Sequence, residues 1–108
     1  MARNCEQALA IGLPAIAFTD HLEFTGGGEG DAINGVATDT RWFSRIKLLD
    51  VSGYLANLEE CRQRYPGLRI LSGVEVGESH LFAASAGAIV RNQPFDRVLG
   101  SLHAVPYQ

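Results

Sequence analysis

The sequence predicts an α/β fold with parallel strands, because short apolar segments alternate with helix-forming segments along the chain. Strands are expected at residues 15–19, 69–76 and 96–103, and helices at residues 2–10, 51–65 and 81–90. Parallel βαβ units with right-handed crossovers explain this alternation better than an antiparallel meander does. The chain has 108 residues, of which 46% are apolar, and this length suits a single domain with one modest core.

Glycine and proline mark the ends of the first elements. Residues 2–10 are rich in strong helix formers, and Gly12 stands where a left-handed residue typically ends a helix. Pro14 precedes the apolar run 15–19, which has the length of a strand buried on both faces and leads into Asp20 and His21. Residues 25–40 are glycine-rich and lack periodicity, so we expect a long loop there.

The second expected helix has recognisable signals at both ends. Asp50 and Ser52 are candidate N-caps, and Pro66 and Gly67 stop the helix. Its apolar residues recur at helical spacing on one face: Tyr54, Leu55, Leu58 and Cys61. The alanine-rich segment 81–90 is the third expected helix, and it lies between the second and third apolar strands.

Charge and composition exclude several classes of protein. Twelve acidic against nine basic residues give a net charge of -3, which disfavours a nucleic-acid-binding face. No apolar run approaches the roughly 20 residues of a membrane helix, and the N-terminus does not resemble a signal peptide, so we expect a cytoplasmic protein that binds no membrane. Cys5 and Cys61 are too far apart in sequence to suggest a disulfide framework, and reduced thiols are expected.

Residues that can bind a metal fall near the ends of all three expected strands. His21 closes the first strand, Glu75 lies near the end of the second, and His103 closes the third. The C-terminal ends of parallel strands meet on one face, where catalytic groups converge in barrel-like α/β folds. Imidazole and carboxylate groups bind divalent Zn, Mn or Fe, and such ions activate water for the hydrolysis of phosphoesters.

Structural roles are the alternatives for each of these residues. A single histidine after an apolar strand is commonly a hydrogen-bonded structural residue, whereas Glu75 within an apolar strand is costly to bury unless it is paired or bound to metal. His80 lies in the polar turn 77–80 and is left out of the site. The glycine cluster 26–30 lacks the Gly-Lys-Ser/Thr ending of a P-loop and is interpreted as a flexible loop.

A small basic and aromatic cluster precedes the second helix. It is either a lid that contacts a substrate phosphate or a solvated segment with one buried aromatic side chain. The cluster comprises Arg41, Trp42, Phe43, Arg45 and Lys47.

Three segments resemble successive motifs of the PHP (polymerase and histidinol phosphatase) family: residues 15–21 (AIAFTDH), 70–75 (ILSGVE) and 95–103 (FDRVLGSLH). Residues 64–68 (RYPGL) resemble its histidinol-phosphatase branch. The resemblance implies a distorted (β/α)7, TIM-like barrel with a centre of two or three divalent metal ions that hydrolyses phosphoesters. By position, His21 and His103 would each ligate a metal and Glu75 would bridge two ions, whereas Asp20 has no ligand role and would accept a hydrogen bond at the strand end.

The sequence also departs from this family's pattern. It lacks the first strand with its His-x-His pair and the C-terminal metal-binding strands, so residues 1–108 are expected to form a partial PHP domain. The open edges of such a partial barrel favour association, including a homo-oligomer.

The expected function is metal-dependent hydrolysis of a small phosphomonoester, similar to histidinol phosphate, by metal-activated water. One alternative is a non-catalytic metal-binding or interaction fragment of a PHP barrel. The other is a PHP module associated with a DNA polymerase, which the acidic charge balance disfavours.

Overall fold

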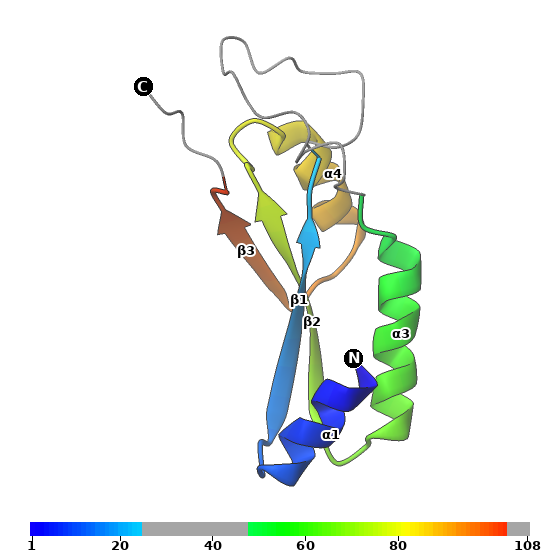
Figure 1. Cartoon of the computed structure of the whole chain (residues 1–108). Coiled ribbons are helices and arrows are strands. Elements are labelled where there is room, and N and C mark those ends of the chain that lie inside the picture. The colour runs from blue at the N-terminus through cyan, green and yellow to red at the C-terminus, as the bar shows by residue number, and fades with distance from the viewer. Residues whose placement is uncertain (25–47, 104–108) are drawn as a thin grey trace.

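The computed structural model describes residues 1–24 and 48–103, which form one open sheet with helices packed along it (Figure 1). The sheet has the order β1-β2-β3, and both neighbouring pairs are parallel. The described elements are α1 (Ala2–Ala10), β1 (Ala15–Leu22), α3 (Val51–Arg64), β2 (Arg69–Gly77), α4 (Ala83–Asn92) and β3 (Arg97–Ser101). The predicted α/β class with parallel strands is therefore confirmed. The expected loop 25–40, the glycine cluster 26–30 and the cluster at 41–47 lie outside the described residues.

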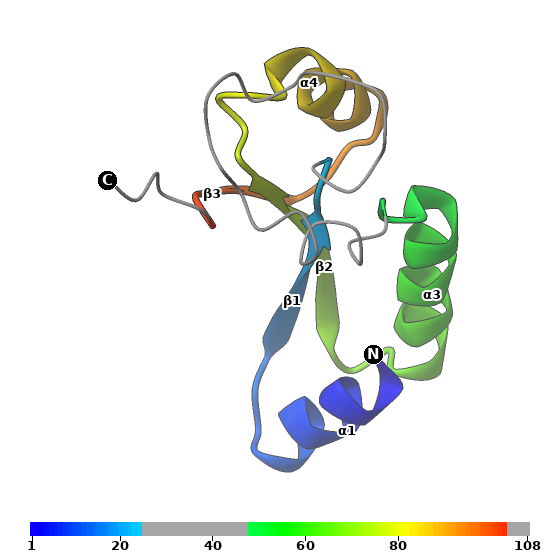
Figure 2. The ribbon, with the colours of Figure 1, turned by 45° about the horizontal axis from the view of Figure 1, so that its top comes forward.

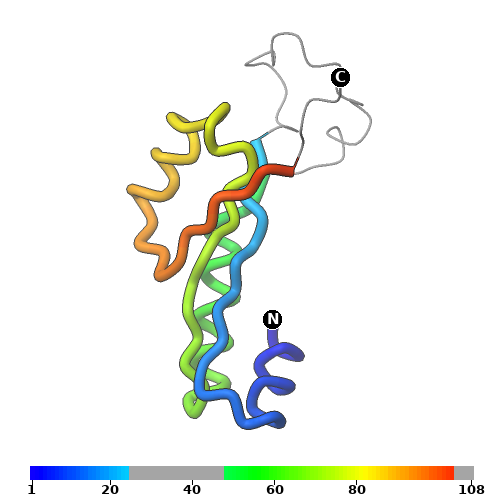
Figure 3. Tube along the Cα trace, turned by 90° about the vertical axis from the view of Figure 1, so that its left-hand side faces the viewer, coloured from blue at the N-terminus to red at the C-terminus, as the bar shows by residue number. Residues whose placement is uncertain are grey.

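The three described helices pack at different positions along the sheet. α1 lies beside the start of β1, α3 runs along the sheet, and α4 lies near the ends of the strands (Figure 1). The turned views keep α1 and α4 at opposite ends of the molecule (Figures 2 and 3). The N-terminal and C-terminal ends of the strands therefore have different surroundings.

The signals at the helix ends act as the sequence predicts. Gly12 adopts a left-handed φ of 77° just after α1. Of the two candidate N-caps of α3, Asp50 takes the role, because its carboxylate accepts a hydrogen bond of 3.0 Å from the backbone N–H of Gly53. α4 begins two residues later than expected, at Ala83.

The strands differ in length and in burial from what the sequence predicts. β1 continues through Asp20 and His21 to Leu22, whereas β3 ends at Ser101, two residues before His103. The expectation that residues 15–19 are buried on both faces is wrong, since these residues are half-buried or exposed. Val98 and Leu99 of β3 are also exposed, at 46% and 47%. The reason is that β1 and β3 are edge strands, each with one paired neighbour in the described part of the chain.

The buried side chains form two clusters rather than one core. The first cluster joins α1, α3 and the start of β2: Cys5, Ala8, Tyr54, Leu58, Cys61, Tyr65, Leu68 and Ile70. The second joins the ends of β1 and β2 to α4: Leu22, Val74, Val76 and Ala86. Leu49 and Phe95 are half-buried against both clusters, so they connect the two ends of the molecule.

Tyr54 fastens α3 to the two longer strands. Its hydroxyl lies 2.6 Å from the carbonyl oxygen of Gly73 and 2.9 Å from that of Phe18, and it accepts a 3.1 Å hydrogen bond from the N–H of Gly73. Burial raises the pKa of Tyr54, so the hydroxyl stays a neutral donor. A side chain at position 73 would overlap the carbonyl oxygens of Phe18 and Arg97, which explains the glycine there.

Ser72 and Asp96 connect β2 to the residue before β3. The carboxylate of Asp96 accepts hydrogen bonds from the backbone N–H of Ser72 at 2.8 Å and from its hydroxyl at 3.0 Å. Both hydrogen bonds lower the pKa of Asp96, and the one from the backbone N–H has the larger effect. The folded state is therefore favoured when Asp96 is ionised.

We expect Tyr54→Phe to lower the free energy of unfolding by about 1–3 kcal/mol, because it leaves the buried backbone groups of Gly73 and the part-buried carbonyl of Phe18 without this partner. Chemical denaturation measures this loss. Tyr65→Phe is the matched control, since the Tyr65 hydroxyl donates only to the carboxylate of Glu6, which is exposed. An equal loss in both variants would contradict the fastening role of Tyr54.

We expect Asp96→Asn to destabilise the chain at neutral pH and to have little effect in strong acid. The contribution of a carboxylate with a lowered pKa is fully present above its unfolded-state pKa of about 3.9 and is lost as the pH falls through the lower folded-state value. Denaturation curves of both proteins at a series of pH values test this. A difference that stays constant down to the lowest pH would show that ionisation of Asp96 contributes nothing.

Candidate metal centre

The sheet register places two of the three predicted ligands side by side. In the pairing of β1 with β2, His21 stands directly opposite Glu75. Side chains of directly paired residues lie on the same face of a sheet, and here Nδ1 of His21 lies 2.7 Å from Oε2 of Glu75. The prediction that strand ends gather these residues therefore agrees with the geometry.

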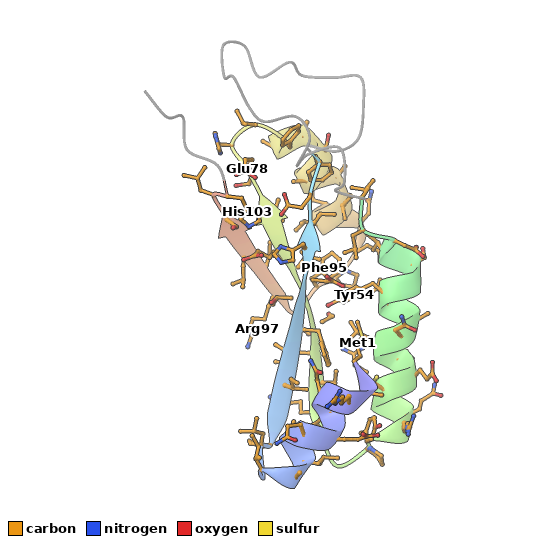
Figure 4. All side chains as sticks on the ribbon, in the orientation of Figure 1. Met1, Tyr54, Glu78, Phe95, Arg97 and His103 are labelled. Carbon is orange, nitrogen blue, oxygen red and sulfur yellow. The ribbon has the colours of Figure 1, made fainter. Side chains whose placement is uncertain are left out.

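His103 completes the group from beyond the end of β3. Its Nε2 lies 3.7 Å from Oε2 of Glu75, and its ring centroid lies 5.6 Å from that of His21. Figure 4 shows His103 at the upper end of the sheet, near Glu78. The three residues singled out in the sequence thus come together at the C-terminal ends of the strands.

Glu23 is a fourth member of the group that the sequence reasoning missed. It follows β1 directly and is buried, with 7% of its surface exposed. Its Oε1 lies 2.8 Å from Nδ1 of His103 and 3.6 Å from Nδ1 of His21. A methyl group at position 77 would overlap the Glu23 carboxylate, so Gly77 provides the space in which this side chain lies.

The Glu23 carboxylate has the surroundings of a metal ligand. Although Oε1 is within ion-pair distance of both histidines, no described residue donates it a hydrogen bond of acceptable geometry. Burial raises the pKa of Glu23, and the neighbouring carboxylates of Glu78 and Glu75 add to the rise, while His103 and His21 oppose it. A buried carboxylate oxygen without a hydrogen bond is costly, and a bound cation offsets that cost.

The donor atoms fit a divalent cation. One nitrogen each of His21 and His103 and one carboxylate oxygen of Glu23 all lie within 4.8 Å of one another. Two imidazoles and one carboxylate are a donor set suited to Zn, Mn or Fe. Glu75 contacts both histidines from the adjacent strand but is not part of this most compact set.

Glu78 holds the backbone that carries His103. It is buried, and its carboxylate accepts a hydrogen bond of 2.5 Å from the backbone N–H of His103. Its own φ is 45°, in the left-handed region that a non-glycine residue adopts at a cost. Its N–H donates a hydrogen bond to the carbonyl oxygen of Ser101. The backbone and the side chain of Glu78 therefore both connect the turn after β2 to the end of β3.

The other polar residues near the strand ends have structural roles or lie apart. Oδ1 of Asp20 accepts a 3.0 Å hydrogen bond from the N–H of His21, the strand-end role expected for it. His80 is exposed and is absent from the donor set found among the described residues.

We expect Glu23→Gln to weaken binding of Mn²⁺ or Zn²⁺ by about 10–100-fold, as measured by isothermal titration calorimetry. The same change should stabilise the metal-free chain at neutral pH, because an acid whose pKa is raised by folding costs stability above its unfolded-state pKa of about 4.3.

Two further variants sharpen this test. Glu59→Gln, at an exposed position of α3, is the control and should change neither quantity. Gly77→Ala should weaken metal binding as well, because it displaces the Glu23 carboxylate. Unchanged affinity in Glu23→Gln would remove Glu23 from the ligand set.

Comparison with known proteins agrees with this geometry. The model of the PHP domain family matches residues 1–108. Neither a curated protein nor a solved structure matches the sequence significantly. Among the described helices, none is long and apolar enough to cross a membrane. The match spans the whole sequence, and the chain therefore belongs to the PHP family, a group associated with metal-dependent phosphoester hydrolysis.

Proposed function

We propose that this chain provides part of a metal-dependent phosphoesterase that hydrolyses a small phosphomonoester. The observation that supports it most is the buried oxygen of Glu23, which accepts no hydrogen bond from the described residues and faces the imidazoles of His21 and His103. The same group lies at the C-terminal ends of parallel strands, where α/β barrels carry their catalytic groups.

The proposed ligands are His21, Glu75 and His103, with Glu23 added to them. A bound divalent ion supplies a water of lowered pKa and neutralises charge on phosphoryl oxygens. Two other carboxylates position the histidine ligands. Asp20 accepts a hydrogen bond from the backbone N–H of His21, and Glu78 accepts one from the backbone N–H of His103. Zn, Mn and Fe all suit this donor set.

The proposed substrate class is a phosphomonoester similar to histidinol phosphate. It rests on the resemblance of residues 64–68, at the end of α3, to the histidinol-phosphatase branch. The proposed complete architecture is a distorted (β/α)7 barrel, to which the described elements contribute parallel strands in sequential order. Among the described residues, β1 and β3 each have one paired neighbour, and the proposal assigns their other edges to further strands or to a second copy of the chain.

One alternative has an observation in its favour. The described residues offer one compact donor set, whereas the hydrolytic centres that the resemblance implies hold two or three ions. A non-catalytic metal-binding fragment of a PHP barrel fits this single set.

The test measures metal content and phosphate release on the same samples of purified protein. With added Mn²⁺ or Zn²⁺, we expect hydrolysis of histidinol phosphate and of p-nitrophenyl phosphate that stops when a chelator removes the metal. His103→Gln should lose both metal and activity. His80→Gln, which changes an exposed histidine outside the donor set, should retain both.

The outcomes separate the two functions. Metal bound in stoichiometric amount without phosphate release would favour the non-catalytic fragment. Phosphate release that a chelator does not affect would contradict the proposed chemistry in this chain.

A further inference from the structure

The described helices pack on one face of the sheet, and the candidate metal ligands lie on the other. Phe18 of β1 packs against the first cluster with α1 and α3, and Leu22 packs against α4 in the second. Successive side chains of a strand point to opposite faces, so His21 points away from the helices, as does its partner Glu75. We call this side of the sheet the site face. Figure 3 views the sheet from this side, with α3 behind the strands.

The sheet register places Arg97 on the site face. Leu99 of β3 is paired with Glu75, and Arg97, two residues earlier, is paired with Gly73. Residues two apart in a strand share a face, so Arg97 and Glu75 lie on the same side of the sheet. Figure 4 shows the Arg97 side chain extending from β3 on the side away from α3.

The Arg97 side chain is long enough to reach a group bound beside Glu75. Arg97 stands two residues along and one strand across from Glu75, which corresponds to about 8 Å between the backbone positions. Gly73, its partner on β2, has no side chain that could stand between the two. The guanidinium can therefore approach the metal centre from the direction of the strand starts.

The positive charge of Arg97 is available for an anion. The side chain is exposed, and its Nη1 donates a 2.7 Å hydrogen bond to the carbonyl oxygen of Asp96. Among the described residues, no carboxylate lies within ion-pair distance of this guanidinium. The Asp96 carboxylate instead accepts hydrogen bonds from Ser72 and lies 3.5 Å from Nη2 of Arg62.

The other arginines of the described residues lie farther from the site. Four of them belong to the helices on the opposite face: Arg3, Arg62, Arg64 and Arg91. Arg69 is on the site face, but it begins β2 and stands six positions before Glu75. Arg97 is therefore the described arginine that the register places nearest to the ligands on their own face.

We propose that Arg97 binds the phosphoryl group of the substrate beside the metal centre and favours phosphomonoesters over phosphodiesters. This role rests on the proposed function, and it assigns the choice between the two classes of ester to a residue of this chain.

The charge and the shape of a guanidinium explain the preference. Its parallel N–H groups match two oxygens of a phosphate. A phosphomonoester has three non-bridging oxygens and carries nearly two negative charges at neutral pH, whereas a diester has two such oxygens and one charge. A monoester therefore keeps two oxygens for Arg97 when the third is bound elsewhere in the site, and it gains more from the positive charge.

The test measures binding of inorganic phosphate to the full chain loaded with one equivalent of Mn²⁺, by isothermal titration calorimetry. Arg97→Gln should weaken phosphate binding by about 10–100-fold, because a hydrogen-bonded charge pair is lost. Arg97→Lys should recover part of this loss, since it restores the charge without the two-pronged geometry. Both variants should bind Mn²⁺ as the wild type does, because Arg97 is not in the donor set.

Arg69→Gln is the matched control. Like Arg97, Arg69 is exposed, begins its strand and lies on the site face, but it stands at the far end of the sheet. The control should change neither phosphate affinity nor Mn²⁺ affinity. Circular dichroism of each variant shows whether it keeps the wild-type fold.

Hydrolysis rates test the choice between esters. The ratio of kcat/KM for p-nitrophenyl phosphate to that for bis(p-nitrophenyl) phosphate should fall about tenfold in Arg97→Gln and stay constant in Arg69→Gln. A constant ratio in Arg97→Gln would contradict the specificity role.

The outcomes distinguish this role from the proposed function. Equal phosphate affinity in the wild type and Arg97→Gln, or an equal loss in Arg69→Gln, would overturn the role of Arg97 whether or not the chain hydrolyses esters. A fall in Mn²⁺ affinity in Arg97→Gln would also overturn it, because the residue would then act on the metal centre. Phosphate binding that depends on Arg97 without any hydrolysis would support the binding role and contradict the catalytic function. A wild-type chain that binds neither Mn²⁺ nor phosphate would contradict both.

Discussion

The parallel pairing of β1 with β2 is the constraint on which the candidate site depends. It sets His21 opposite Glu75, and a shift of one residue would turn one of the two side chains to the other face of the sheet. Tyr54 helps to hold this arrangement, because its hydroxyl contacts backbone groups of both strands at Phe18 and Gly73. The contact lies three residues before His21 and two before Glu75, so α3 is attached to both strands close to the site without contributing a residue to the donor set found among the described residues.

Several interactions near the candidate metal centre are energetically unfavourable. Glu23 and Glu78 are buried carboxylates close to each other, and Glu78 adopts a left-handed backbone conformation. Each of these features costs stability in a chain without bound cation. Such costs are typical of functional sites, where the fold elsewhere supplies the compensating stability. Here the larger cluster of buried side chains, around α1 and α3, lies at the other end of the molecule.

The sequence predicted the elements and three members of the site because both follow from local signals. Apolar runs and helix periodicity gave the order of strands and helices, and parallel strands bring their C-terminal ends together. Glu23 was missed because the first strand was expected to end at His21, and no residue beyond that end was considered. Once β1 is extended to Leu22, the spacing His21-x-Glu23 puts both side chains on one face, and this pattern could have revealed the fourth member.

The role of Glu78 could not be predicted in the same way. Its carboxylate is paired with the backbone of His103, 25 residues away, and no local pattern reports such a partner. Its positive φ is also invisible in the sequence, because the left-handed region is usually occupied by glycine. The exposure of Val98 and Leu99 could not be predicted either. An apolar strand at the edge of a sheet has the same sequence pattern as a strand in the middle.

The division of the buried side chains into two clusters has a consequence for motion. Cooperative units of a protein open with separate free energies when few contacts join them, and here β2, Leu49 and Phe95 form the connection. The smaller cluster around Leu22 and Val76 should exchange its amide hydrogens with solvent faster than the cluster around Leu58. Binding of a cation would then slow exchange at the ends of the strands selectively, so that part of its binding energy would be spent on ordering this half of the molecule.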